Sequence, residues 1–80
     1  MVAVAFHDSG GRPLAGAVVS IAASPGEVND IAMIADDHGE ISITPSAYGL
    51  YEFAVFSGAA VRNVRTQINE GDKTLTVEVG

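Results

Sequence analysis

The sequence predicts an all-β domain, a sandwich of about seven short strands. Short runs in which apolar and polar residues alternate with a period of two recur along the whole chain. Clusters of Gly, Pro, Asp, Asn and Ser separate these runs every 8–12 residues or so. No stretch sustains the 3.6-residue apolar period of a helix. Eighty residues suffice for one domain, so a single unit is expected to span residues 1–80.

The first two predicted strands flank a tight turn. Alternation predicts a strand over residues 2–7, with Val2, Val4 and Phe6 on its buried face. Residues 8–13 combine two glycines with Asp, Ser and Pro, which is a strong turn signal. A second strand is predicted over residues 16–24. Its inward face is expected to carry Ala17, Val19, Ile21 and Ala23.

Five further strands are predicted over residues 30–35, 41–44, 50–57, 61–68 and 73–79. The first of these is apolar on both faces, so its register stays open, and a short helix is the alternative. In the longest strand, Tyr51, Phe53 and Val55 are expected to point inward. Tyr51 is expected to bond its hydroxyl to backbone, as in a tyrosine corner. The last strand is expected to bury Leu75, Val77 and Val79.

The turn motifs follow one another along the chain in an order that is typical of one domain family. Asp8 opens a turn with Gly11, and residues 13–17 read Pro-Leu-Ala-Gly-Ala. Residues 36–39 read Asp-Asp-His-Gly before an alternating strand, residues 45–51 run from a proline to Gly-Leu-Tyr, and residues 70–72 read Glu-Gly-Asp. This order resembles the carboxypeptidase regulatory-like domains, which are transthyretin-like (prealbumin-like) sandwiches often appended to larger bacterial proteins. The resemblance implies a seven-stranded, Greek-key, Ig-like β-sandwich with an accessory, stabilising or partner-binding role.

Charge and composition restrict the partners and the compartment. The net charge is −6, so nucleic acid and anionic membranes, which need clustered Lys and Arg, are not expected partners. No apolar run approaches the roughly 18 residues of a membrane helix, so no membrane insertion is expected. The first residues lack the basic region of a signal peptide. The compartment therefore stays open between the cytoplasm and a module of an exported or secreted bacterial protein.

The size of the chain predicts that it needs support from another protein surface. A domain of this length buries only about 60% of its unfolded surface. It contains no cysteine that could form a disulfide or a thiolate metal site. Since 48% of the residues are hydrophobic, an apolar surface patch is expected. A partner protein or a homo-oligomer would cover such a patch.

Neither catalysis nor a cofactor is predicted. If the strands alternate in direction, the turns at 8–12, 36–40 and 58–60 lie at one end, where Asp36, Asp37 and Glu40 are weak candidates for a divalent cation. Their spacing matches no metal motif, and turn formation explains them better. The 5-hydroxyisourate hydrolases of the transthyretin family end in Tyr-Arg-Gly-Ser. Residues 76–80 lack that motif, so an enzyme of this type is disfavoured.

The outward face of the 50–57 strand is the strongest candidate for a binding surface. If Tyr51, Phe53 and Val55 are buried, solvent faces the alternate residues, which carry few charges. Arg62 and Arg65 are expected nearby, either pairing with Glu52 or Glu78 or orienting an acidic partner. The predicted partner-binding residues are Leu50, Glu52, Ala54, Phe56, Arg62, Arg65 and Val18, with Ala22 and either Ile34 or Met33 beside them. A carbohydrate- or surface-binding module is the alternative, for which Tyr48 and Phe56 supply aromatic rings.

Overall fold

The computed structural model describes residues 1–26, 32–58 and 60–79, and within these ranges it contains strands and turns but no helix. No helix capable of crossing a membrane is found among these residues. The strands are β1 (Val2–His7), β2 (Val18–Ala23), β3 (Met33–Ile34), β4 (Glu40–Ile43), β5 (Gly49–Ser57), β6 (Ala60–Ile68) and β7 (Thr74–Glu78). The all-β prediction is therefore confirmed.

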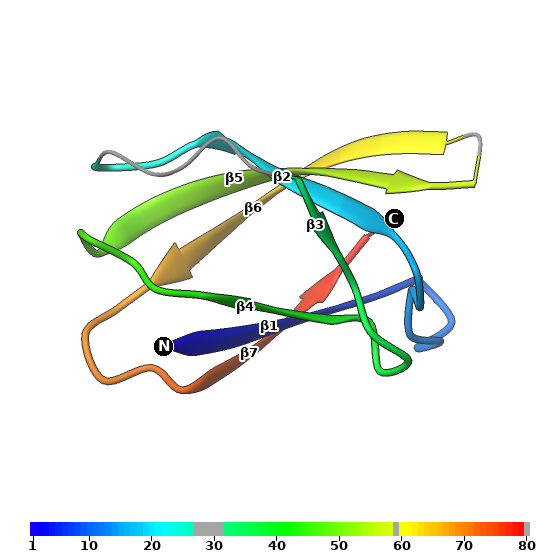
Figure 1. Ribbon diagram of the computed structural model, residues 1–80, viewed down its shortest axis with the longest axis horizontal. Helices are drawn as coiled ribbons and strands as arrows, with labels where there is room; N and C mark the ends of the chain where they lie inside the picture. The colour runs from blue at the N-terminus through cyan, green and yellow to red at the C-terminus, as the bar shows by residue number, and fades with distance from the viewer. Residues whose placement is uncertain (27–31, 59, 80) are drawn as a thin grey trace.

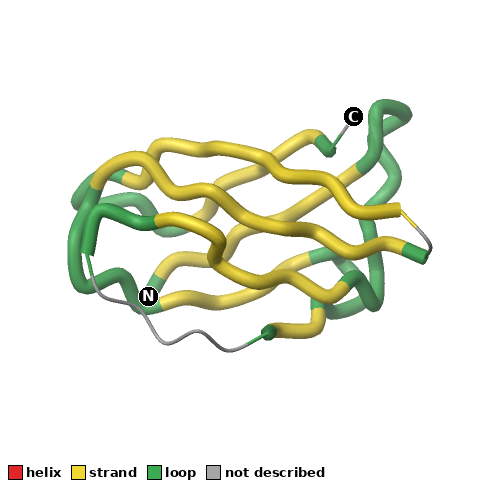
Figure 2. Tube along the Cα trace, turned by 90° about the horizontal axis from the view of Figure 1, so that it is seen from above, coloured by secondary structure: helices red, strands yellow, loops and turns green. Residues whose placement is uncertain are grey.

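The strands form two sheets that lie one above the other (Figures 1 and 2). The three-stranded sheet has the order β4-β1-β7, in which β1 pairs antiparallel with β4 and parallel with β7. The four-stranded sheet has the order β3-β2-β5-β6, and all of its pairings are antiparallel. Each sheet therefore has one face toward the other sheet and one face toward solvent.

The core lies between the two sheets and is built from the inward positions of alternating strands. From β1 it takes Val2, Val4 and Phe6, and from β5 it takes Tyr51, Phe53 and Val55, all of them buried as predicted. The rings of Phe6 and Phe53 meet edge to face across the two layers, with centroids 5.5 Å apart. Val77 of β7 is buried, as is Val79, which follows the strand, and Leu75 of β7 packs against the core.

Two loops at one end of the molecule share one geometry. The Oδ1 atom of Asp8 accepts hydrogen bonds from the backbone N–H groups of Gly10 and Arg12, and that of Asp36 accepts from His38 and Glu40 in the same way. Each loop also places a glycine at positive φ three residues after its aspartate. These aspartates therefore hold turns, as the sequence pattern indicated.

One part of the predicted strand pattern was wrong, and another is confirmed only in part. Ala23 is exposed rather than inward, because an irregularity between Ile21 and Ala23 shifts the register of β2 against β5. Ala23 consequently pairs with Glu52, whose side chain points away from the core. In the 30–35 segment, only Met33–Ile34 is strand within the described residues, and residues 30–31 lie outside them.

Candidate functional site

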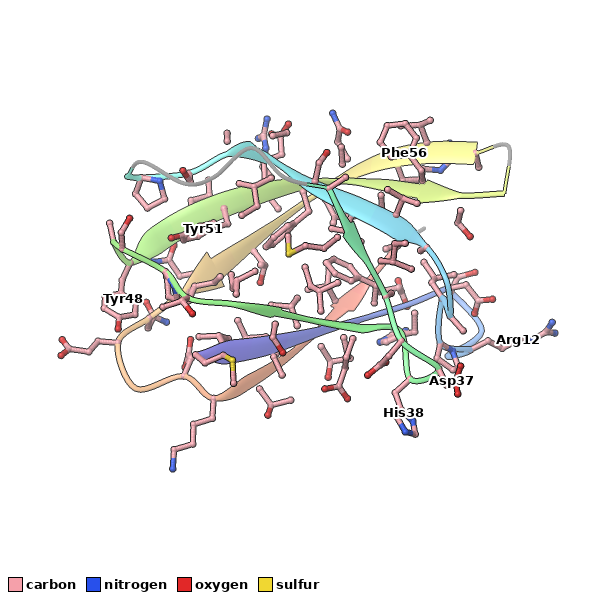
Figure 3. The ribbon with its side chains drawn as sticks, viewed as in Figure 1. Arg12, Asp37, His38, Tyr48, Tyr51 and Phe56 are labelled. Atoms are coloured by element: carbon pink, nitrogen blue, oxygen red, sulfur yellow. The ribbon has the colours of Figure 1, made fainter. Side chains whose placement is uncertain are left out.

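An apolar row crosses the solvent face of the four-stranded sheet. Cross-strand pairing aligns Ile34 of β3 with Val18 of β2, Val18 with Phe56 of β5, and Phe56 with Val61 of β6. Their exposed fractions are 73%, 37%, 44% and 51%, in that order. We call these four residues the apolar row. Figure 3 shows Phe56 directed away from the body of the molecule.

The apolar row is exposed because its members alternate with core residues. Val19 and Val55, the neighbours of Val18 and Phe56 along the chain, are buried, so the row must lie on the opposite face. A solvated sheet face normally carries polar residues, and adjacent apolar side chains on four strands are unusual there. The row therefore needs an explanation beyond the scattered apolar surface of ordinary proteins.

The rest of this face carries small and polar side chains. Next to the apolar row, Ala54 pairs with Ser20 on one side and with Asn63 on the other. Further along β5, Glu52 pairs with Arg65, whose Nε donates to Oε1 of Glu52 at 2.9 Å. Leu50 stands at the far end and is 55% exposed. Ser20, Ala54 and Asn63 thus form a strip of smaller side chains between the apolar row and the ion pair of Glu52 and Arg65.

The structure brings most of the predicted binding residues together on this face. Val18, Ala54, Phe56, Glu52, Leu50 and Arg65 all lie on it. Arg62 lies elsewhere, because it pairs with Val55, whose side chain points into the core. In Figure 1 the start of β6 lies beyond the strands of the three-stranded sheet, and Arg62, although on the inward side, is exposed there. Of the two arginines, Arg65 alone lies beside Glu52.

Sequence reasoning did not assign Val61 to the binding surface. Its place depends on the hairpin register, in which Ser57 pairs with Ala60 and Phe56 therefore with Val61. The sequence predicts a turn over residues 58–60, which leaves the cross-strand partner of Phe56 undefined. The short separation of the two strands is the signal that could have found it, since a tight hairpin fixes the register of every later pair.

The acidic turns at the end of the molecule do not converge into a ligand set. Figure 3 places Asp37 and His38 at the same end as Arg12. Within the described ranges, no group of three or more His, Asp or Glu side chains is placed to hold a metal ion. The N–H of Glu40, followed by that of His38, lowers the pKa of Asp36 by bonding its carboxylate.

Tyr51 has the structural role that the sequence predicted. Its ring is fully buried, and its hydroxyl donates a 2.6 Å hydrogen bond to the carbonyl of Ala47, at the entrance to β5. Burial raises the pKa of this hydroxyl. Tyr51 therefore anchors the loop before β5 and is not available to a ligand.

A scan against protein-family models finds no match to the chain, and a search of the curated proteins finds no relative.

Proposed function

We propose that the domain is a non-catalytic protein-binding module, on which a partner protein docks against the solvent face of the four-stranded sheet. The observation that carries this proposal is the apolar row, four exposed apolar side chains in register on four neighbouring strands. With strands about 4.8 Å apart, the row is a band roughly 14 Å wide. A band of this shape suits a protein surface better than a small molecule, which needs a concave site.

Charge favours a different protein over a second copy of this chain as the occupant. The chain carries a net charge of −6, so two copies repel each other. On the proposed binding face, the opposite charges of Glu52 and Arg65 form an ion pair. A partner that covers this face therefore buries little net charge, so the free-energy cost of desolvation is small. Full burial of a Phe or Ile side chain contributes about 1.5–3 kcal/mol, and the half-exposed Phe56 would supply part of that.

The accessory role agrees with the family resemblance, which we retain as part of the proposal. The chain is then a seven-stranded transthyretin-like sandwich of the carboxypeptidase regulatory-like kind. The two-sheet arrangement and the matching geometry of the Asp8 and Asp36 loops support it. The carbohydrate-binding alternative gains no support, since the exposed rings of Tyr48 and Phe56 lie toward opposite ends of the molecule (Figure 3) and form no common platform.

Matched charge substitutions on the two solvent faces test the proposal. Immobilised wild-type domain, Phe56→Glu and Thr76→Glu are compared for the proteins that each captures from native extract. Thr76 is exposed on β7 of the other sheet, so it controls for the added charge. A protein bound by the wild type and Thr76→Glu but not by Phe56→Glu supports docking on this face. Equal capture by all three contradicts it, as does concentration-dependent dimerisation in sedimentation that Phe56→Glu abolishes.

A further inference from the structure

The second exposed feature of the four-stranded sheet is its β6 edge. In the described part of the chain, β6 pairs with β5 on one side and with no strand on the other. It has nine residues, and the first four are all exposed. An unpaired edge of this length presents a row of backbone donors and acceptors to solvent. Natural edges are usually short, covered or protected by charged side chains. The β6 edge is long and its charges are two arginines, which disfavour cationic or apolar strands, so it is a candidate for addition of an acidic strand.

The register shows which backbone groups face the free edge. In an antiparallel pair, alternate residues bond the neighbouring strand, and the residues between them point the other way. Because Ser57 and Ala60 close a tight hairpin as a hydrogen-bonded pair, Arg62 and Val64 also bond β5. Val61, Asn63 and Arg65 then direct their N–H and C=O groups outward. Consistently, the guanidinium of Arg62 reaches the carbonyl of Val61 with a 3.4 Å hydrogen bond.

Charge distinguishes this edge from the rest of the molecule. The chain has four Lys and Arg residues against ten Asp and Glu, and two of the four, Arg62 and Arg65, lie on β6. They point to opposite faces of the sheet, so they flank the free edge from both sides. Arg65 bonds Glu52 through Nε, yet its side chain is 71% exposed, so most of its donors remain accessible.

We propose that the β6 edge binds an extended acidic segment of the partner protein, which adds as a fifth, antiparallel strand with carboxylates opposite Arg65 and Arg62. This proposal rests on the proposed function and names the chemistry of the partner. Antiparallel addition continues the pattern of the whole sheet. Two copies of this chain do not suit the edge, because pairing β6 with itself would bring four guanidinium groups together.

The register also defines the pattern of the bound segment. A carboxylate opposite Arg65 is followed three residues later by one opposite Arg62, because the strands run antiparallel. The residue after each carboxylate is apolar: one lies opposite Val64, and the other opposite Val61, where it extends the apolar row by a fifth position. The expected motif is acid, apolar, any residue, acid, apolar.

A synthetic peptide tests this inference on the intact domain. The probe is Thr-Glu-Val-Thr-Glu-Val-Thr with blocked ends, and amide hydrogen exchange is followed residue by residue. Binding is expected to slow exchange at Val61, Asn63 and Arg65, and to weaken as salt rises. The same peptide with both glutamates replaced by glutamine is expected to bind less tightly. Methylation of the central threonine nitrogen, which faces Asn63, is expected to abolish binding, whereas methylation of the preceding valine nitrogen is not.

Variants of the domain test the role of Arg62. Arg62→Ala is expected to weaken the peptide about two- to fivefold, the effect of one exposed ion pair, and Arg62→Lys is expected to retain most of the affinity. Arg12→Ala, with the same loss of charge in the exposed 8–13 loop, is expected to have no effect. Equal binding of the glutamine peptide, or protection at a different strand edge, overturns the inference. If the peptide fails while Phe56→Glu still loses its partner, this inference falls and the proposed function stands.

Discussion

Phe56 on β5 and Val61 on β6 are direct cross-strand partners, and each leaves about half of its side chain in solvent. Their neighbours along the chain, Val55 and Arg62, form the next pair on the opposite face. Because pairing with β2 also fixes β5, a slip of one residue in this hairpin would turn Val61 inward and Arg62 outward. The place of Val61 in the apolar row therefore depends on the register of this hairpin, and the stability of the fold can be tested separately from binding.

Phe56→Glu is expected to change the free energy of unfolding by less than about 1 kcal/mol, because a glutamate at that position remains in solvent. Phe53→Ala, three residues away in the same strand, is expected to cost about 3–5 kcal/mol because it empties a core position. Urea denaturation of both variants measures the difference. Comparable destabilisation by the two substitutions would show that Phe56 is part of the core.

Gly39 and Gly11 occupy equivalent positions in the two aspartate loops, with φ of 71° and 83°, but their surroundings differ. A Cβ on Gly11 meets nothing within 4 Å, so Gly11→Ala is expected to cost about 1–2 kcal/mol, the conformational term alone. A Cβ on Gly39 would collide with the carbonyl of Phe6 and lie 2.9 Å from the backbone nitrogen of Leu14. Thermal unfolding should therefore show a clearly larger loss for Gly39→Ala. Equal losses would mean that the 36–40 loop does not pack against β1 as described.

The carboxylates of Asp8 and Asp36 make the fold sensitive to acid. The pKa of each is lowered below its ordinary 3.8, for Asp8 mainly by the N–H of Arg12 and for Asp36 mainly by the N–H of Glu40. A depressed pKa stabilises the fold above the unfolded value, and this contribution is lost as the pH falls through the folded value. In Asp36→Asn, whose amide oxygen still accepts both bonds, the melting temperature should fall less steeply below about pH 4. An unchanged acid slope would contradict this role.

Tyr51 is expected to act on stability through its hydroxyl. Tyr51→Phe removes the bond to the Ala47 carbonyl and should cost about 0.5–1.5 kcal/mol. Because burial raises the pKa of Tyr51 above its ordinary 10.0, the folded state holds its proton longer than the unfolded state does. Stability should consequently fall as the pH rises above about 10, and less so in Tyr51→Phe. The exposed Tyr48→Phe is the control, and an identical alkaline profile in all three proteins would contradict the assignment.

The sequence predicted the strands and their buried faces well, because alternation with period two reports directly which side chains a sheet can bury. Alternation alone correctly predicts the burial of Val4, Phe6, Tyr51 and Phe53. Pairing and bulges are set by contacts between segments far apart in the chain. The prediction for Ala23 was wrong because of the irregularity in β2. The alternation of apolar and polar residues around Ala23 does not reveal this irregularity.

The candidate site was predictable in part for the same reason. Alternation placed Phe56 and Leu50 on the outer face without knowledge of the neighbouring strands. The apolar row appears only when register aligns Ile34, Val18 and Val61 with Phe56. Arg62 and Arg65 face opposite sides of the sheet because they lie three residues apart in one strand, so only Arg65 shares the face of Glu52.

Photocrosslinking from the binding face tests the central claim most directly. A photoreactive residue replaces Asn63, which lies between the apolar row and the ion pair, and for comparison Ser42, exposed on β4 of the other sheet. In native extract, position 63 should crosslink a partner protein and position 42 should not. Excess unlabelled wild-type domain should suppress that crosslink, whereas a folded Phe56→Glu, Val61→Glu double variant should not. Equal crosslinking from both positions, or equal competition by the double variant, would contradict docking on the apolar row.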